Sequence, residues 1–189
     1  MRKILISILL FCNVQSCLAE VDVLAVAKSV SDQKYKGWTY GNSSEKKQIN
    51  CVQFLLSVLQ RCLGRDLSPD EIKMVSIDYE FADLGKSVEE RDPRTWGVQR
   101  AIVDSLKCGN KVEISDVRPG DFIQYWIKPK RGPWFGHAAV VSQVHRENNG
   151  QVSVTIYGAH KSENRISDSG YKLKLSGDKR YFYIARMTP

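Results

Sequence analysis

The hydrophobic pattern of the chain changes its period once, near residue 114. Before that point apolar residues recur three and four positions apart, as on one face of a helix. After it they form short β-branched and aromatic runs separated by turn residues. Helices followed by an antiparallel sheet predict an α+β fold, with N-terminal helices packed on a central antiparallel β-sheet. We expect helices at 22–36, at 51–63, from Ser68, and at 96–107 before Gly109-Asn110, and strands at 122–127, 137–145, 151–160, 171–176 and 180–186.

Residues 1–19 have the features of a secretory signal peptide. Arg2 and Lys3 form a basic start, an apolar stretch follows, and small residues precede a cleavage site after Ala19. The apolar stretch is too short to cross a bilayer as a permanent helix. The residues before Cys17 also resemble a degenerate lipobox, which leaves a lipid anchor on that cysteine as the alternative. In both cases we expect an exported protein, either periplasmic or secreted.

The exported part of the chain is basic. The full sequence has a formal net charge of +7, and the leader carries two of the 28 basic residues and none of the 21 acidic ones, which leaves +5. This charge suits an acidic cell-wall polymer, although it also serves solubility. No Lys/Arg-rich block or nucleic-acid motif is present, so we do not expect DNA or RNA as a partner. Residues 20–189 are enough for a single domain with its own core, and we expect a monomer.

Three cysteines remain after the leader: Cys51, Cys62 and Cys108. An odd number in an oxidising compartment leaves at least one free thiol or an intermolecular bridge. A disulfide between Cys62 and Cys108 would leave Cys51 free, and three reduced core thiols are the alternative. There is no CxxC pair and no Cys/His spacing typical of a metal site, so we expect no structural zinc and no cofactor.

Two of the three histidines lie in the predicted hairpin over residues 137–160. If the turn is centred on Asn148 and Asn149, His137 faces His160 directly, and if the turn is one residue later they lie diagonally on one face. A three-residue loop would put them on opposite faces unless a bulge intervened. His145 shares their parity but lies too far along the strand, and we interpret it as a solvated residue at the hairpin tip.

Cys51 stands at the predicted N-terminus of an apolar helix. There the helix dipole and a nearby imidazolium would lower the pKa of its thiol. Nucleophilic cysteine catalysis needs such a Cys-His pair and a third group that orients the base. His137 could be the base and His160 the orienting group. Composition and spacing equally allow a core thiol and two ordinary histidines on a strand.

Four short motifs occur in a fixed order along the chain. They are Tyr40-Gly41, Asn50 to Phe54, Val117 to Phe122, and Gly136 to Val141. Their order and spacing over roughly residues 37–165 resemble the NlpC-type and CHAP-like cell-wall cysteine peptidases. The resemblance implies a papain-like fold in which the Cys at the helix start is the nucleophile, the His after Gly is the base, and a residue on the next strand orients that base. Carried over, these are Cys51, His137 and His160.

The sequence departs from this family beside the nucleophile. Asn50 stands where many members have Asp, and Val52-Gln53 replaces a small Ser-Gly pair, so we expect a bulkier wall there. The resemblance places Tyr40 near the oxyanion, although a Gly-flanked aromatic often only packs. Trp134, in a loop, is the candidate substrate contact, whereas Trp126 is expected in the core because it lies in a strand.

These observations predict an exported cysteine hydrolase that acts on peptidoglycan or its muropeptides. The NlpC-type resemblance implies cleavage of the stem peptide between D-glutamate and diaminopimelate, and the sugar-to-peptide amide, as in CHAP amidases, is the near alternative. Two other functions stay open. One is a non-catalytic wall-binding module with a decayed site, which Val52-Gln53 suggests. The other is acyl transfer to a lipid or an amine by the same Cys-His pair.

Overall fold

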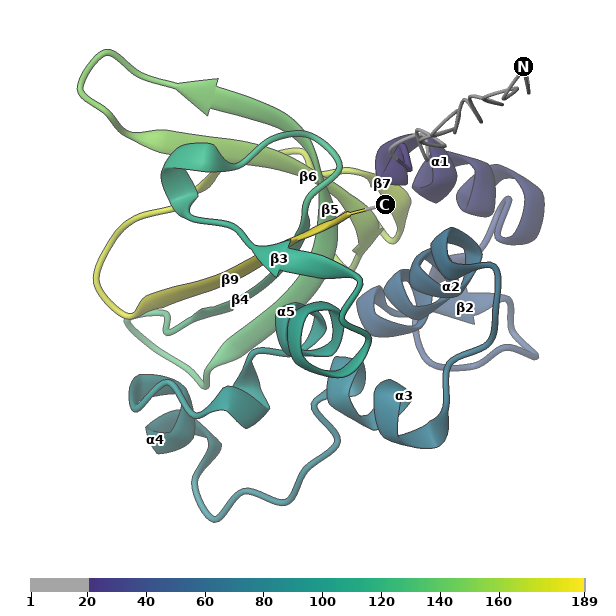
Figure 1. Ribbon diagram of the computed structural model, residues 1–189, viewed down its shortest axis with the longest axis horizontal. Coiled ribbons are helices and arrows are strands. Elements are labelled where there is room, and N and C mark those ends of the chain that lie inside the picture. The colour runs from purple at the N-terminus through teal and green to yellow at the C-terminus, as the bar shows by residue number, and fades with distance from the viewer. Residues whose placement is uncertain (1–20, 189) are drawn as a thin grey trace, which may run out of the picture.

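The first half of the chain is helical in the computed structural model, which describes residues 21–188 (Figure 1). Between the first two helices, β1 (Thr39–Tyr40) and β2 (Gln48–Ile49) form a short parallel pair. The α-helices are α1 (Val23–Lys34), α2 (Cys51–Leu63), α3 (Pro69–Ser76), α4 (Leu84–Glu89) and α5 (Val98–Arg100).

The second half forms a sheet with the strand order β3-β9-β4-β5-β6-β7, and β8 pairs with β6. All of its pairings are antiparallel. The α1 and α2 helices lie together on one side of it (Figure 1). The predicted α+β class, with N-terminal helices and a mostly antiparallel central sheet, is therefore confirmed. The strands are β3 (Gly109–Lys111), β4 (Phe122–Ile127), β5 (Phe135–Arg146), β6 (Val152–His160), β7 (Arg165–Asp168), β8 (Leu173–Lys174) and β9 (Arg180–Met187).

The α2 helix begins and ends where the sequence predicts. The Asn50 side chain accepts a hydrogen bond of 2.8 Å from the Gln53 N–H, and the Gln53 side chain accepts one of 3.1 Å from the Asn50 N–H. This capping box satisfies two backbone donors at the helix start. Gly64 ends the helix with a φ of 64°, a left-handed conformation that favours glycine. Gln53, which replaces a small residue of the family pattern, thus fixes the backbone around Cys51.

The helix expected at 96–107 is present only in part. α5 is short, and Ala101–Ser105 continues it as a wider π-helix. Gly109 and Asn110, which we expected to end this helix, instead begin β3. A Cβ atom on Gly109 would lie 2.1 Å from the carbonyl oxygen of Arg186 on β9, so the close approach of the two strands requires glycine there. The strand expected at 171–176 is reduced to β8, and β7 was not expected.

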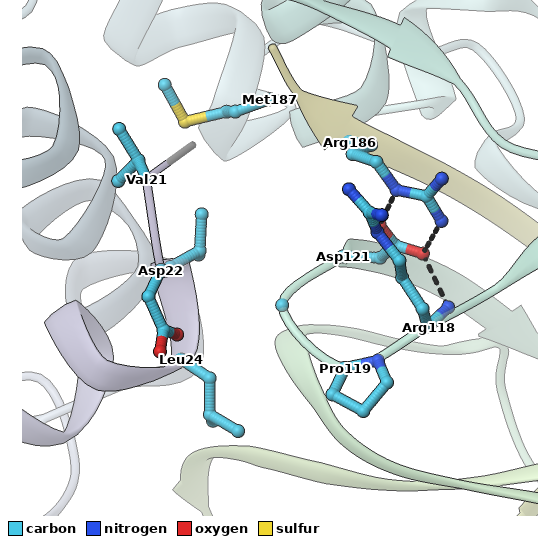
Figure 2. Close-up of a pocket in the computed structure, with 10 residues that line it drawn as sticks. Val21, Asp22, Leu24, Arg118, Pro119, Asp121, Arg186 and Met187 are labelled. Carbon is cyan, nitrogen blue, oxygen red and sulfur yellow. Dashed lines mark hydrogen bonds and ion pairs between the residues drawn. The ribbon is translucent and has the colours of Figure 1, made fainter. Parts of the chain in front are cut away.

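A buried carboxylate holds the Pro-Gly-Asp turn before β4. Asp121 accepts hydrogen bonds from the Arg186 guanidinium at 2.7 and 2.9 Å, and from the Arg118 backbone N–H at 2.8 Å (Figure 2). Because a buried carboxylate without partners is costly, this network fixes the turn against β9. Figure 2 also shows a hollow between this turn and the start of α1, and Cys51 is not among the residues that line it.

Candidate active site

The Cys51 sulfur is surrounded by hydrogen-bond donors. Cys51 is the first residue of α2 and is buried. The Tyr40 phenol and the backbone N–H groups of Val52 and of Ala138 on β5 lie close enough to this sulfur to favour its thiolate form. Tyr40 reaches it because β1 pairs with β2, which ends two residues before Cys51. The structure thus brings the predicted tyrosine to the predicted nucleophile.

The two predicted histidines meet because of a β-bulge in the β5–β6 hairpin. Near the tip, the hairpin has a register that would, if continued regularly, put His137 and His160 on opposite faces of the sheet. The register shifts by one residue at Ser142, between Val141 and Gln143. Beyond this bulge the two histidines come level, and their ring centroids lie 5.1 Å apart. The sequence left open a hairpin whose register puts the two histidines on opposite faces unless a bulge intervenes. The structure has this register and the bulge.

His137 is enclosed by aromatic rings. Phe135 stacks on its imidazole with centroids 6.1 Å apart and an interplanar angle of 14°, and Tyr125 lies at 5.6 Å. His137 is only 5% exposed. Its Nε2 atom is buried and has no hydrogen-bond partner among residues 21–188. The ring therefore has a nitrogen that is not committed to another group of the described chain.

His160 is held by the backbone. Its Nε2 atom lies 3.3 Å from the carbonyl oxygen of Ile156, and the Ser167 carbonyl is a second partner. The carboxylate of Glu163 is close enough to favour the charged form of the ring. The two imidazoles are tilted by 31°. His160 is therefore positioned to fix His137 by packing against it.

The α2 helix and His137 lie on different faces of the sheet. Ala138 and Val140 belong to the same buried cluster as the apolar side chains of α2. His137 pairs with Tyr125 of β4 and, by the alternation of side chains along a strand, faces the other way. Contact between Cys51 and His137 thus requires the helix start to reach an edge of β5.

Such an edge exists because β5 and β6 part near the histidines. Their pairing stops at Val140 and Tyr157 in the described chain, whereas β6 continues beside β7 as far as His160. The Ala138 N–H lies in the part of β5 that β6 no longer pairs with, and it is close enough to the Cys51 sulfur to favour the thiolate. The sulfur thus lies near the backbone of the residue next to His137. Cys51 and His137 also line one common pocket.

The electrostatics of the site favour a neutral resting pair. Burial raises the pKa of the Cys51 thiol above its ordinary 9.0, although the surrounding N–H groups and the Tyr40 phenol act in the opposite direction. Burial, with the neighbouring His160, lowers the pKa of His137 to about 3. Burial also lowers the pKa of His160. The expected net lowering of the thiol pKa is not found, because burial outweighs the backbone N–H groups and the Tyr40 phenol.

Alkylation of Cys51 by iodoacetamide is expected to be slow at neutral pH and to rise roughly tenfold per pH unit between pH 7 and pH 9, because only the thiolate reacts. Burial has moved the pKa of this thiol above 9.0, so no plateau should appear in this range. Mass spectrometry of the peptide that contains Cys51 measures the rate. A rate that is already constant below pH 7 would show a preformed thiolate and contradict this assignment.

The other predicted side chains have different places. Trp126 is buried as expected, with its Nε1 donating to the Thr95 carbonyl at 2.9 Å. A Cβ atom on Gly136 would come within 2.6 Å of the Trp126 ring, which explains the glycine before His137. Trp134 packs on Tyr181 at 5.7 Å and is not among the residues that line the Cys51 pocket, so its predicted substrate contact gains no support.

His145 and the remaining cysteines lie away from the pocket. His145 is half-buried, with Nε2 3.3 Å from the Thr155 hydroxyl, and the bulge turns it to the face opposite His137. Strand parity predicted His145 on the His137 face, which is wrong because of the bulge, and the side chain is half-buried where a solvated residue at the hairpin tip was expected. Cys62 and Cys108 are free thiols. Burial and the proximity of Cys108 raise the pKa of Cys62 to about 12.

Several residues at the site were not predicted. Tyr125 and Phe135 enclose the base, and Tyr79 and Phe81 line the pocket beside Cys51. The period-two pattern around residue 125 could have placed Tyr125 on the His137 face, since the two strands pair directly. Tyr79 and Phe81 lie in a segment where apolar and acidic residues alternate, and this period-two pattern could have placed both rings on one buried side.

The leader predicted over residues 1–19, with the alternative lipid anchor on Cys17, lies outside the described residues. Within residues 21–188 no helix has the length and the apolar character needed to cross a bilayer. No family model matches the chain, and no curated protein matches it either.

Proposed function

We propose that the protein is an exported cysteine hydrolase of papain-like fold that cleaves an amide bond in peptidoglycan. The observation that carries this proposal is that Cys51 and His137 line one pocket, in which the Ala138 N–H, next to His137, lies close to the Cys51 sulfur. A nucleophile and a base that share a pocket are the minimum for acyl transfer to a thiol.

The reaction begins with a neutral thiol and a neutral imidazole. As the Cys51 sulfur attacks the amide carbonyl, His137 takes the thiol proton, and it then gives that proton to the leaving amine as the C–N bond breaks. Water attacks the resulting thioester with His137 again as base, which releases the carboxylate and restores the thiol. The Tyr40 phenol and the backbone N–H groups at the start of α2 are the donors available for the oxyanion.

His160 is proposed to orient His137 through the packing of its ring. Its backbone hydrogen bonds hold its ring in place, and the ring packs against the base at 5.1 Å. Like-charge repulsion between the two rings also lowers the pKa of His137. His160 thus helps to keep the base neutral and ready to accept a proton.

Three sequence features support peptidoglycan as the substrate. The leader predicts export, the basic exported chain suits an acidic wall polymer, and the motifs around Tyr40, Cys51 and His137 resemble cell-wall peptidases.

Digestion of purified sacculi tests this function. The wild-type protein is expected to release soluble muropeptides with a new free amine, and mass spectrometry identifies the bond that is cut. Cys51→Ala should release none, whereas Cys62→Ala, which removes a thiol outside the pocket, should behave as wild type. The same products from Cys51→Ala, or none from the wild type, would reject the proposal.

One observation favours a second function. The buried Cys51 has a raised pKa, as in an unreactive core thiol, which agrees with a wall-binding module that lacks activity. In that case wild type and Cys51→Ala would both bind sacculi and sediment with them, and neither would release product.

A further inference from the structure

An apolar pocket adjoins the candidate nucleophile. It has a volume of about 300 Å³ and lies between the start of α2, the segment after α3, and strands β4 and β5. None of the side chains that line it is an Asp, Glu, Lys or Arg, and the imidazole of His137 is its one histidine. Its lining consists of Cys51, Val52, Ser76, Ile77, Tyr79, Phe81, Leu84, Gln124, Trp126, Gly136, His137 and Ala138.

The segment over residues 77–83 separates apolar from acidic side chains. Ile77, Tyr79 and Phe81 are partly buried and line the pocket. Asp78 and Glu80, which alternate with them, are exposed. The segment contains no basic residue, although the protein as a whole is basic. The segment thus turns its apolar side chains to the pocket and its carboxylates to the solvent.

The aromatic walls are held in place from outside the pocket. The rings of Tyr79 and Phe81 meet edge to face with centroids 6.4 Å apart. The Arg94 guanidinium lies 4.9 Å from the Phe81 ring centre, and that of Arg100 lies 5.9 Å from the Tyr79 ring centre. Arg94 is also paired with Asp92 at 2.6 Å. These contacts favour a preformed pocket, since the rings have partners without a ligand.

We propose that this pocket binds an uncharged, apolar group of the substrate next to the scissile bond, up to the size of a leucine or phenylalanine side chain, and disfavours a carboxylate. The inference rests on the proposed function only in taking Cys51 as the reacting group. An apolar group gains from leaving water there, at about 0.8 kcal/mol per buried CH₂. A carboxylate would lose its hydration there without finding an Arg or Lys side chain in the lining.

The pocket also bears on which wall bond is cut. The stem-peptide bond between D-glutamate and diaminopimelate is flanked by carboxylates. The sugar-to-peptide amide joins a lactyl group to alanine, so methyl groups flank it. Within peptidoglycan, the chemistry of the lining therefore fits the sugar-to-peptide amide better.

Two chloroacetamides that label thiols test the pocket directly. N-hexylchloroacetamide and N-(5-carboxypentyl)chloroacetamide present chains of similar length, one apolar and one anionic. In both, the sulfur attacks the CH₂ carbon, a C–S bond forms, chloride leaves and the thiol proton goes to the buffer. We expect the hexyl-to-carboxypentyl rate ratio at Cys51 to exceed the ratio at Cys62 and Cys108 of the same protein by about tenfold or more. Peptide mass spectrometry reads all three thiols in one experiment.

Substitution of Phe81 makes the test specific to the pocket. Phe81→Lys introduces a cation and should bring the ratio at Cys51 down at least to that of the two reference thiols. Phe81→Leu keeps an apolar wall and should retain the preference, which guards against a folding defect in the lysine variant. Equal ratios at all three thiols in the wild type, or a preference unaffected by Phe81→Lys, would overturn the inference. Labelling does not require hydrolysis, so failure on sacculi with a clear hexyl preference would reject the proposed function alone.

Discussion

Replacing His137 by alanine is expected to slow the release of muropeptides by about 10³-fold, within the range that a general base contributes. The reason is specific to this site. The Cys51 thiol has a pKa raised by burial, so it has little thiolate of its own and depends on a base during the attack. Initial rates on purified sacculi measure the effect.

His145→Ala is the matched control for this substitution. His145 lies in the same hairpin and is half-buried like many strand residues, but the bulge puts it on the opposite face. His145→Ala should have a rate within about twofold of the wild-type rate, because His145 does not line the Cys51 pocket. A His137→Ala variant that kept a tenth or more of the wild-type rate would show that another group takes the thiol proton.

Acidification from pH 7 to pH 4 is expected to destabilise the folded protein by several kcal/mol. The pKa of His137 is about 3 in the folded state and 6.5 for an ordinary histidine. Between these values the unfolded chain binds a proton that the folded chain does not, so the free energy of unfolding falls as the pH falls. The contribution is complete above pH 6.5 and amounts to at most about 5 kcal/mol. Burial of His160 acts in the same direction.

Urea unfolding at pH 7, 5.5 and 4.5 measures this loss. His137→Phe should flatten the pH dependence, because a phenylalanine ring fits among Tyr125, Phe135 and His160 without a charge to bury. His145→Gln should keep the wild-type dependence. A wild-type midpoint that does not move between pH 7 and pH 4.5 would mean that His137 can be protonated in the folded state at little cost.

Local chemistry accounts for the parts of the fold that the sequence predicted. α2 begins after Asn50 because the Asn50 side chain caps the helix, and it ends at Gly64 because glycine readily adopts a left-handed backbone conformation. Both effects act over only a few residues. β4 follows from an aromatic and β-branched run. The end of the third helix was missed because Gly109 has a long-range role, the contact with β9, that is indistinguishable locally from a helix stop.

In the candidate site, too, features with a local sequence signal could be predicted and features set by long-range contacts could not. Cys51, His137 and His160 could be proposed from motifs and strand parity, but the bulge at Ser142 has no glycine or proline to mark it. The sign of the Cys51 pKa shift depends on how closely β5 covers the sulfur, which is a tertiary property. The alternation of apolar and acidic residues over 77–81 indicates that Tyr79 and Phe81 share a buried side, but it does not show that this side faces Cys51, which is a long-range contact.

The extra residue at Ser142 also divides the hairpin into an outer and an inner half, which differ in how well they tolerate insertions and deletions. The outer half, which reaches away from the helices (Figure 1), can gain or lose residues at its tip without turning the inner half, because the inner register is set below the bulge. Loss of one residue at the bulge itself would rotate one histidine away from the other. Variation in length should therefore accumulate in the outer arm of the hairpin, while the count of residues between the bulge and each imidazole stays constant.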